Sequence, residues 1–254
     1  MLESRPRVAW AARRLLAGYH SLAYALRQTI PVAGKTSCPC CGATPTGFRP
    51  YLHEAKVECP QCASHERHRL LCYYLFEDRP ELLEHATSLL HFAPEPCLEG
   101  RFRVIDDLRY VTADLNPRHA TVSCDITDLP FEEAAFDVIL CSHVLEHVED
   151  DRAALLEIAR VLRPGGTALI LVPLDESRAQ TYEDDAIRSP AARAAAYWEP
   201  GHLRLYGLDF ARRLEAAGLV VSVDRYVHQL DRSLVAKHNM RSGGVYVCTK
   251  PSPP

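Results

Sequence analysis

Apolar residues in the first thirty positions follow a helical repeat. They recur at every third or fourth position, which places them on one face of a helix. The stripe consists of Val8, Ala12, Leu15, Tyr19, Leu22, Leu26 and Ile30. Through Lys35 the segment carries six basic residues and one acidic residue. We predict a basic amphipathic helix over residues 1–36 that packs on its own or a partner domain; peripheral contact of residues 1–30 with a membrane surface, or with RNA, is the alternative.

From Leu83 onward, apolar runs typical of strands alternate with segments typical of helices. The runs are continuous rather than alternating, as in strands of a parallel sheet that is covered on both faces. Strands are predicted at residues 88–93, 109–115, 121–126, 136–142, 167–174, 220–227 and 244–249. Helices are predicted at residues 150–162 and 208–219. The pattern predicts an α/β fold with a doubly wound, seven-stranded, mostly parallel sheet.

The composition excludes several classes of protein. Of 254 residues, 47% are hydrophobic and 24% are charged, which is ordinary for a soluble globular protein and excludes a disordered, collagen-like or coiled-coil chain. The best apolar run, from Ala168 to Val172, falls far short of the roughly 18 residues that span a bilayer. The net charge of −4 argues against a protein that holds nucleic acid mainly through phosphates.

The unusual feature of the composition is its ten cysteines, half of which cluster between residues 38 and 62. The first thirty residues contain five arginines and no apolar stretch before a cleavage site, so we expect no secretory signal peptide and a cytoplasmic protein. In that reducing compartment, clustered cysteines hold metal more often than they form disulfides.

Two CxxC pairs form the core of the cluster. Cys38 and Cys41 make the first pair, and Cys59 and Cys62 make the second after seventeen intervening residues. Four thiolates on two tight turns satisfy a tetrahedral zinc ion and leave no open coordination position, so we predict a structural zinc site. Unliganded cysteines are the alternative, and Cys40 is left undecided as a bystander or a substitute ligand.

A joining helix is predicted to follow the knuckle. Ser64 can cap its start, and His65 and His68 lie in its first turn. We expect both histidines to be solvated, with a role in a binding cleft as the alternative. The chain thus divides into the basic helix, residues 37–72 with the zinc knuckle and the start of the joining helix, and a large domain over residues 73–254.

Three stretches of the large domain together resemble class I S-adenosylmethionine-dependent methyltransferases, in particular type 11-like methyltransferase domains. They are Cys124-Asp-Ile-Thr-Asp-Leu-Pro-Phe131, Phe136-Asp-Val-Ile-Leu-Cys-Ser-His-Val-Leu-Glu-His-Val148 and Val161-Leu-Arg-Pro-Gly-Gly166. Each is modest alone, but their order and spacing are specific. The resemblance implies a Rossmann-like methyltransferase fold that binds S-adenosylmethionine across the carboxyl ends of the first four strands.

The resemblance assigns contacts with the cofactor to the ends of two neighbouring strands. Asp114, followed by Leu115, closes the second strand, where an acid can accept hydrogen bonds from both ribose hydroxyls. An acid that only caps a loop is the alternative. Asp125 follows the third strand, where similar enzymes pair an acid with the adenine amine while the backbone amide of the next residue, Ile126, meets the ring.

The first loop departs from the family pattern, which is glycine-rich. Here it reads His91-Phe-Ala-Pro-Glu-Pro-Cys97. The side chain of Ala93 is small enough to let the backbone come near the cofactor, though less closely than glycine would. Pro94 and Pro96, however, lack amide donors. We predict a rebuilt loop in which His91, Ala93 and Glu95 contact the cofactor and Glu95 receives its ammonium group. A domain that binds the donor poorly or not at all is the alternative.

The residues after the fourth strand are the candidates for chemistry. Ser142 and His143 lie beside the expected position of the sulfonium and are counted among the contacts with the cofactor. Methyl transfer is a direct displacement, so the protein mainly aligns the reacting groups, and a base is needed only if the acceptor loses a proton. His143 is the predicted catalytic base, with packing at a strand end as the alternative.

The insert over residues 175–206 is the predicted acceptor lid, because loops after sheet strands carry specificity in such folds. The predicted contacts with the acceptor are Tyr182, His202, Arg204 and Tyr206. An ordinary helical excursion with a charged surface is the alternative. We expect an oxygen or nitrogen acceptor on a small molecule or glycan.

Two further functions stay open. One is a zinc-ribbon binding module whose methyltransferase-like domain is inactive, which the glycine-poor first loop supports. The other is an RNA methyltransferase, because some ribosomal RNA methyltransferases also carry an N-terminal zinc ribbon. The net acidity and the lack of an Asn-Pro-Pro-Tyr or Asp-Pro-Pro-Tyr motif after the fourth strand argue against RNA. The oligomeric state does not follow from the sequence.

Overall fold

The computed structural model describes residues 36–51, 54–240 and 244–252. The basic helix predicted for the N-terminus therefore lies outside the described residues, apart from its last position. The chain divides into two compact units, which we describe separately. The cysteine unit contains described residues 36–78, 95–101 and 226–240, and the sheet unit contains residues 79–94, 102–225 and 244–252.

The cysteine unit is built from short elements. Strands β1 (Arg49–Tyr51) and β2 (Glu54–Glu58) pair in an antiparallel hairpin. The helical segments are α2 (Glu66–Tyr73), the π-helical turn η1 (Tyr74–Asp78), α4 (Pro96–Phe102), the 3-10 turn η3 (Tyr226–His228) and α8 (Arg232–His238). The sequence placed residues 95–101 and 226–240 in the large domain, whereas the structure groups them with the cysteines.

One buried arginine explains why a late segment of the chain joins the cysteine unit. Arg69 of α2 is fully buried, and its guanidinium lies 3.9 Å above the ring of Phe48. It donates hydrogen bonds to the carbonyl oxygens of Val57, Ser64, His238 and Asn239. Because a buried cation needs all its donors satisfied, these bonds fix the end of α8 against the hairpin and α2.

The sheet unit contains the predicted seven strands. They are β3 (Ser88–Phe92), β4 (Arg109–Asp114), β5 (Val122–Ser123), β6 (Phe136–Ser142), β7 (Leu162–Leu171), β8 (Val220–Asp224) and β9 (Val245–Thr249). They form one sheet in the order β5-β4-β3-β6-β7-β9-β8. Neighbouring strands from β5 to β7 are parallel, and β9 is antiparallel to both β7 and β8. The predicted seven-stranded, mostly parallel, doubly wound sheet is confirmed.

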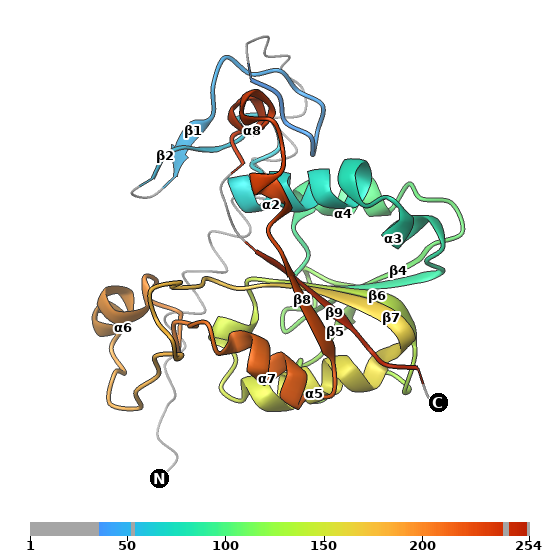
Figure 1. Ribbon diagram of the computed structural model, residues 1–254, viewed down its shortest axis with the longest axis vertical. Helices are drawn as coiled ribbons and strands as arrows, with labels where there is room; N and C mark the ends of the chain where they lie inside the picture. Colours follow the sequence, from blue (N-terminus) through green and yellow to red (C-terminus); the bar gives the residue numbers. More distant parts are fainter. Residues whose placement is uncertain (1–35, 52–53, 241–243, 253–254) are drawn as a thin grey trace. The chain divides into compact units, whose positions relative to one another are not determined.

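The remaining elements of this unit are helices. They are α3 (Glu81–Glu84), the 3-10 turn η2 (Leu145–His147), α5 (Asp151–Val161), α6 (Pro190–Tyr197) and α7 (Phe210–Ala216). Figure 1 shows α5 and α7 side by side on one face of the sheet. Their apolar residues, such as Leu155 and Phe210, form one core with Ile139 and Ile170 of the strands. No helix in the described part of the chain is long and apolar enough to cross a membrane.

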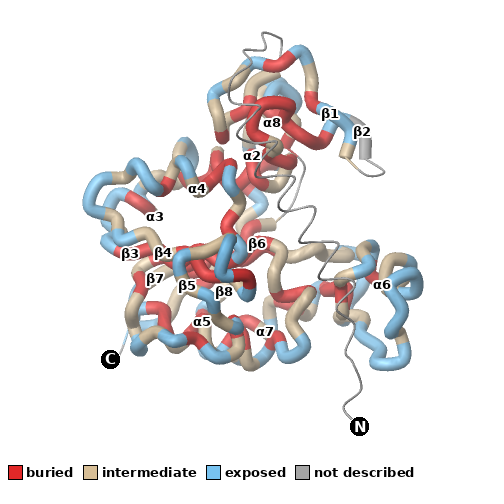
Figure 2. The backbone as a smooth tube through the Cα atoms, turned by 180° about the vertical axis from the view of Figure 1, so that it is seen from behind, coloured by how far each residue is buried: buried red, intermediate tan, exposed pale blue. Residues whose placement is uncertain are grey.

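The strands are buried on both faces, as the continuous apolar runs predicted. Leu90 and Ile139 belong to the core under α5 and α7, while Leu89 and Leu140, which alternate with them, are also fully buried. Figure 2 shows the central strands as buried and α6 as largely exposed.

The junction of α5 and β7 differs from the prediction. The side chain of Asp150 caps α5 by accepting a hydrogen bond of 2.9 Å from the backbone N–H of Ala153, as the sequence indicated. Strand β7, however, begins at Leu162 rather than at residue 167 and ends at Leu171. The Pro-Gly-Gly turn is therefore part of the strand, and a Cβ on Gly166 would lie 2.8 Å from the carbonyl oxygen of Asp137, so only glycine fits there.

Strand order reverses at β3, and this reversal locates the expected ligand site. Strand β4 lies on one side of β3, and β6, which comes later in the chain, lies on the other. In open α/β sheets, ligands bind beyond the carboxyl ends of the strands at such a switch point.

Candidate functional site

The parallel pairing of β3, β4, β5 and β6 brings the carboxyl ends of these four strands to one edge of the sheet. Phe92 of β3 pairs with Ala113 of β4 and with Cys141 of β6, and Ala113 pairs with Val122 of β5. Because these strands are parallel, the residues that follow each of them lie at the same edge. The structure thus brings together the predicted site residues at the four ends, namely Ala93, Asp114, Leu115, Asp125, Ile126, Ser142 and His143.

Two of these residues have a strained backbone. Ala93 has a φ angle of 45° and His143 a φ angle of 55°, in the left-handed region that favours glycine. The N–H of Ala93 donates to the carbonyl of Ala113 at 2.8 Å, and that of His143 donates to the carbonyl of Leu171 at 2.9 Å. Strain of this kind persists where the surrounding structure fixes it, and it is concentrated at functional sites. Ala93 therefore takes the conformation that a glycine would take in a glycine-rich loop.

Asp114 is held in place by the loop that follows it. Its Oδ1 accepts a hydrogen bond of 2.7 Å from the backbone N–H of Asn116, so part of the carboxylate caps the turn. The side chain is half-buried at the end of β4. Leu115, the next residue, is 66% exposed. The carboxylate of Asp114 suits the hydroxyl groups of a ribose, and the exposed apolar side chain of Leu115 suits a flat ring attached to it.

Asp125 follows the end of β5, at the same edge of the sheet as Asp114. Its Oδ1 accepts hydrogen bonds from the N–H and the hydroxyl of Thr127, at 2.9 and 2.8 Å, while Ile126 is buried. Burial raises the pKa of the Cys124 thiol, and the charges of Asp125 and Asp114 raise it further. The backbone N–H of Cys124 donates to the carbonyl of Asp114 at 3.2 Å, which links the ends of the two strands.

The two other predicted contacts with the cofactor already have partners of their own. The side chain of His91 is completely buried, and its Nδ1 lies 2.8 Å from the hydroxyl of Tyr110, so it packs inside the sheet unit rather than at the strand ends. Glu95 belongs to the cysteine unit, where its carboxylate lies 3.6 Å from Nε2 of His68. His65 and His68 are themselves buried, so the expectation that they are solvated was wrong.

His143 faces a carboxylate that the sequence did not single out. Its Nδ1 lies 3.3 Å from Oε1 of Glu146, three residues later, and 29% of its side chain is exposed. Glu146 is completely buried. Burial raises the pKa of Glu146, but the neighbouring imidazoles of His143 and His147 outweigh this effect, so the net pKa is lowered. The available signal was the spacing of three between His143 and Glu146.

The insert after β7 holds two residues that were predicted to bind the acceptor but are buried structural groups. Arg204 donates to the carbonyl oxygens of Leu145, Val148 and Glu149 and to the carboxylate of Glu183. Tyr206 is fully buried, and its hydroxyl donates to Asp151 at 2.9 Å. Arg204 and Tyr206 therefore fix the insert to the end of β6 and the start of α5, and this part of the prediction is corrected.

The other two predicted acceptor contacts occupy different positions. Tyr182 is half-buried and packs against Tyr197, with 5.4 Å between the ring centroids. His202 is buried, and its Nε2 lies 3.9 Å from Oε1 of Glu146 and 3.1 Å from Oε2 of Glu199. Burial lowers the pKa of His202, but these two carboxylates raise it by a larger amount. His202 therefore lies with His143 and Glu146, close to the end of β6.

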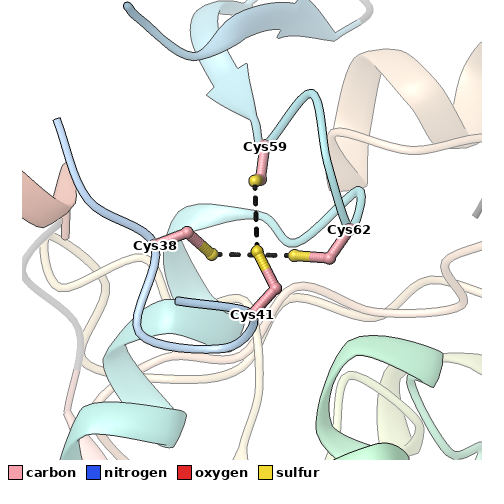
Figure 3. A group of neighbouring side chains, drawn as sticks. All are labelled: Cys38, Cys41, Cys59 and Cys62. Atoms are coloured by element: carbon pink, nitrogen blue, oxygen red, sulfur yellow. Dashed lines mark hydrogen bonds between the residues drawn. The ribbon is translucent and has the colours of Figure 1, made fainter. Parts of the chain in front are cut away.

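The four cysteines of the CxxC pairs point toward one another in the cysteine unit (Figure 3). Their sulfur atoms all lie within 4.8 Å of one another. The distance between sulfurs is 3.6 Å for Cys38 and Cys62 and 3.9 Å for Cys41 and Cys59. A disulfide needs about 2.05 Å, whereas four sulfurs at 2.3 Å from one zinc ion are about 3.8 Å apart. The spacing and donor chemistry therefore fit zinc.

The two cysteine pairs lie on equivalent turns. The N–H of Gly42 donates to the carbonyl of Cys38 at 2.8 Å, and the N–H of Ala63 donates to that of Cys59 at 2.9 Å. Both donors have positive φ angles, 72° at Gly42 and 58° at Ala63. Cys40 lies outside the cluster, because its Sγ contacts the carbonyl oxygen of His68 at 3.6 Å.

A separate cleft of about 750 Å³ lies along α5 and α7 in the sheet unit. Arg152, Leu156, Leu208 and Arg212 are among its lining residues. None of the residues predicted for the cofactor lines it. We place the candidate site at the strand ends instead, because the carboxylates and the strained backbone gather there.

Comparison with known proteins relates part of the chain to methyltransferases. Residues 102–170 match the family model of the Methyltransferase domain. The demethylmenaquinone methyltransferase of Mycolicibacterium vanbaalenii is 33% identical over 110 residues, which cover 38% of this chain and 48% of that protein. The ubiquinone/menaquinone biosynthesis C-methyltransferase UbiE of Xylella fastidiosa is 43% identical over 72 residues, 28% of this chain and 26% of that protein. The chain thus spans about half the length, or less, of these curated relatives.

Among solved structures, the [4+2]-cyclase SpnF has the same fold. Its TM-score is 0.51 at 15% sequence identity, and the superposition covers 82% of this chain and 88% of that chain. Together with the strand order and the match over residues 102–170, this likeness identifies the fold of the sheet unit as the Rossmann-like methyltransferase fold. The fold does not decide the reaction, which has to be argued from the site.

Proposed function

We propose that this chain is an S-adenosylmethionine-dependent methyltransferase. The observation that carries the proposal is the set of residues at the carboxyl edge of the sheet, where Ala93, Asp114, Asp125 and His143 follow four parallel strands around the switch point. The match of residues 102–170 to a methyltransferase domain supports the same function.

In the proposed complex, Asp114 and Asp125 bind the adenosine part of the donor. The turn bond from Asn116 fixes the Asp114 carboxylate, which accepts hydrogen bonds from the ribose hydroxyls. Leu115 offers its exposed side chain to the adenine ring, while Asp125 and the N–H of Ile126 meet the ring's polar edge. Ala93, Ser142 and His143 border the methionine part. S-adenosylmethionine supplies the electrophilic methyl group when bound.

We propose a small molecule or a glycan as the acceptor, with oxygen or nitrogen as the methylated atom. Two curated relatives are named as methyltransferases of menaquinone or ubiquinone formation, which supports a small-molecule acceptor. His143, partly exposed and paired with the buried Glu146, is suited to take a proton from an acceptor hydroxyl or amine.

We further propose that the cysteine unit holds one structural zinc ion. Cys38, Cys41, Cys59 and Cys62 would supply four thiolates and leave no open position for a substrate. The zinc would stabilise the two turns and would not take part in methyl transfer.

A second candidate function is a zinc-ribbon binding module with an inactive methyltransferase-like domain. The first loop favours it, since Pro94 and Pro96 have no N–H to offer the donor and no glycine lies between His91 and Gly100. In this case S-adenosylmethionine would not bind, although the sheet unit would fold normally.

Transfer of a labelled methyl group separates these functions. The purified protein is incubated with labelled S-adenosylmethionine and a cell lysate, and the product is fractionated into RNA, protein, lipid, glycan and small molecules. We expect label in the small-molecule or glycan fraction and none with Asp114→Ala. Label in RNA would favour the RNA methyltransferase, and no transfer by wild type would favour the binding module.

A further inference from the structure

A carboxylate and two imidazoles from distant segments of the sheet unit meet beside the end of β6. Glu146 and His147 belong to η2, and His202 comes from the insert after β7. One possible ligand atom of each residue lies within 4.8 Å of the other two. We propose that Glu146, His147 and His202 form a second metal site, which binds a divalent transition-metal ion with nitrogen and oxygen ligands.

The buried carboxylate requires a positive partner. Glu146 is completely buried, and among the described residues neither of its oxygens has a hydrogen-bond partner of good geometry. The nearest imidazole nitrogens belong to His143 at 3.3 Å, His202 at 3.9 Å and His147 at 4.0 Å. Charge-assisted hydrogen bonds are shorter, about 2.7–2.9 Å. Since an uncompensated buried carboxylate costs several kcal/mol, a cation between these groups would satisfy it.

Both histidines are oriented by backbone carbonyls, as metal-bound histidines usually are. Nδ1 of His147 lies 2.9 Å from the carbonyl oxygen of Gly201, and Nδ1 of His202 lies 2.7 Å from that of Tyr197. A carbonyl can only accept, so each Nδ1 carries a proton. In the neutral imidazole, the lone pair of Nε2 then points to the side of Glu146, ready to bind a metal ion.

The distances and the donor types indicate which ion fits. Around an ion with bonds of about 2.1 Å, neighbouring ligand atoms lie about 3.0–3.4 Å apart. Nε2 of His147 lies 4.0 Å and Nε2 of His202 lies 3.9 Å from Oε1 of Glu146. Both distances are slightly longer than this range, and small side-chain rotations would shorten them to it. Two imidazoles and a carboxylate, with no thiolate, suit zinc, cobalt or iron(II) better than magnesium or calcium. Glu199, 3.1 Å from His202, either adds a second carboxylate or competes as an ion-pair partner.

The open side of this site faces the reaction centre of the proposed function. The side chains of Glu146 and His202 are at most 6% exposed, whereas those of His147 and His143 are 17% and 29% exposed. Coordination positions not filled by the protein therefore face the side of His143. The inference about the acceptor rests on the proposed methyl transfer. The arrangement favours an acceptor with a hydroxyl group, because a bound metal ion would make the hydroxyl proton easier to remove.

Cobalt titration tests the site independently of activity. Protein loaded with one equivalent of zinc, which fills the tighter thiolate site and leaves the proposed second site open, is titrated with Co²⁺ by calorimetry and visible absorption. We expect about one equivalent to bind without a thiolate-to-cobalt charge-transfer band. Glu146→Gln and His147→Ala should each weaken binding at least about tenfold. His85→Ala, which changes an exposed histidine of the same unit, should leave binding unchanged.

Three outcomes would overturn the site: no cobalt binding, binding unaffected by both variants, or cobalt bound only with the thiolate band. Circular dichroism and thermal melts establish that the variants fold. Binding of S-adenosylhomocysteine is measured on the same samples, because Asp114 contributes to that binding but not to this site. Failure of the metal site is thereby distinguished from failure of the proposed methyltransferase activity.

Discussion

The backbone N–H of Ala93 donates a 2.8 Å hydrogen bond to the carbonyl of Ala113, and this bond holds Ala93 in the left-handed region at a φ of 45°. Alanine in this region costs roughly 1–2 kcal/mol. Glycine avoids that cost but loses more entropy on folding. We expect Ala93→Gly to stabilise the protein by up to about 1 kcal/mol, and Ala93→Val to destabilise it by at least as much, since β-branched residues avoid positive φ.

Urea denaturation of these variants measures the effect. Ala86→Gly is a matched control, because Ala86 precedes the same strand and is not among the residues with positive φ in the described chain. It should lower the stability slightly. Equal destabilisation by Ala93→Gly and Ala86→Gly would show that Ala93 is not strained.

The four-cysteine cluster predicts a tightly held metal ion. Metal analysis of protein as purified should give about one zinc per chain at this site, because four thiolates form one closed tetrahedron. Cys59→Ser should lose that zinc and destabilise the cysteine unit. Cys248→Ser, which changes a buried cysteine of the sheet unit, should retain it. Retention of zinc by Cys59→Ser would refute the site.

Arg204 is predicted to matter for stability rather than for acceptor binding. Its guanidinium is buried among three carbonyl oxygens and Glu183, so Arg204→Met leaves these acceptors unpaired. We expect a loss of about 3–5 kcal/mol in the free energy of unfolding. Arg212→Met, at the surface of α7, should cost little. If Arg204→Met folds with wild-type stability and only raises KM for the acceptor, the structural role is wrong.

We predict that the carboxyl group of Asp137 contributes to the loss of stability in acid. Burial raises the pKa of its carboxyl, but hydrogen bonds from Thr87, Ser88 and Arg163 lower it to about 2, against an ordinary value of 3.8. Because the folded state binds the proton less readily than the unfolded state, the carboxylate's contribution is complete above the unfolded pKa and is lost as pH falls from about 4 to 2. We expect about 1 kcal/mol after allowing for solvent screening.

Denaturation at a series of pH values measures this contribution. In the wild type, the free energy of unfolding should decline between about pH 4 and pH 2. Asp137→Asn should be less stable near neutrality and should show a shallower decline. Identical pH profiles for the two proteins would contradict the assignment to Asp137.

The sheet could be predicted from the sequence because its signal is local. Continuous apolar runs gave all seven strands, and Asp150 marked the start of α5. The third strand proved shorter than predicted, Val122–Ser123, because Asp125 forms a turn with Thr127. In a strand buried on both faces, periodicity does not reveal which way a side chain points, so the packing of His91 against Tyr110 could not be predicted.

The parts of the site that were missed depend on contacts distant in sequence. Arg204 looked like a surface residue of a lid, but its acceptors, such as the carbonyl of Leu145, lie 59 residues earlier in the chain. Glu146 was not singled out, because its histidine neighbour His202 comes from the insert. No local pattern predicts such pairs, since they arise only when the insert folds back onto the end of β6.

Calorimetry with S-adenosylhomocysteine tests the central claim, binding of the methyl donor at the strand ends. We predict that the wild type binds with at least micromolar affinity, that Asp114→Ala abolishes the heat of binding, and that Asp106→Ala, an exposed acid before the same strand, retains it. The absence of binding heat for correctly folded wild-type protein, or undiminished binding by Asp114→Ala, would contradict the account.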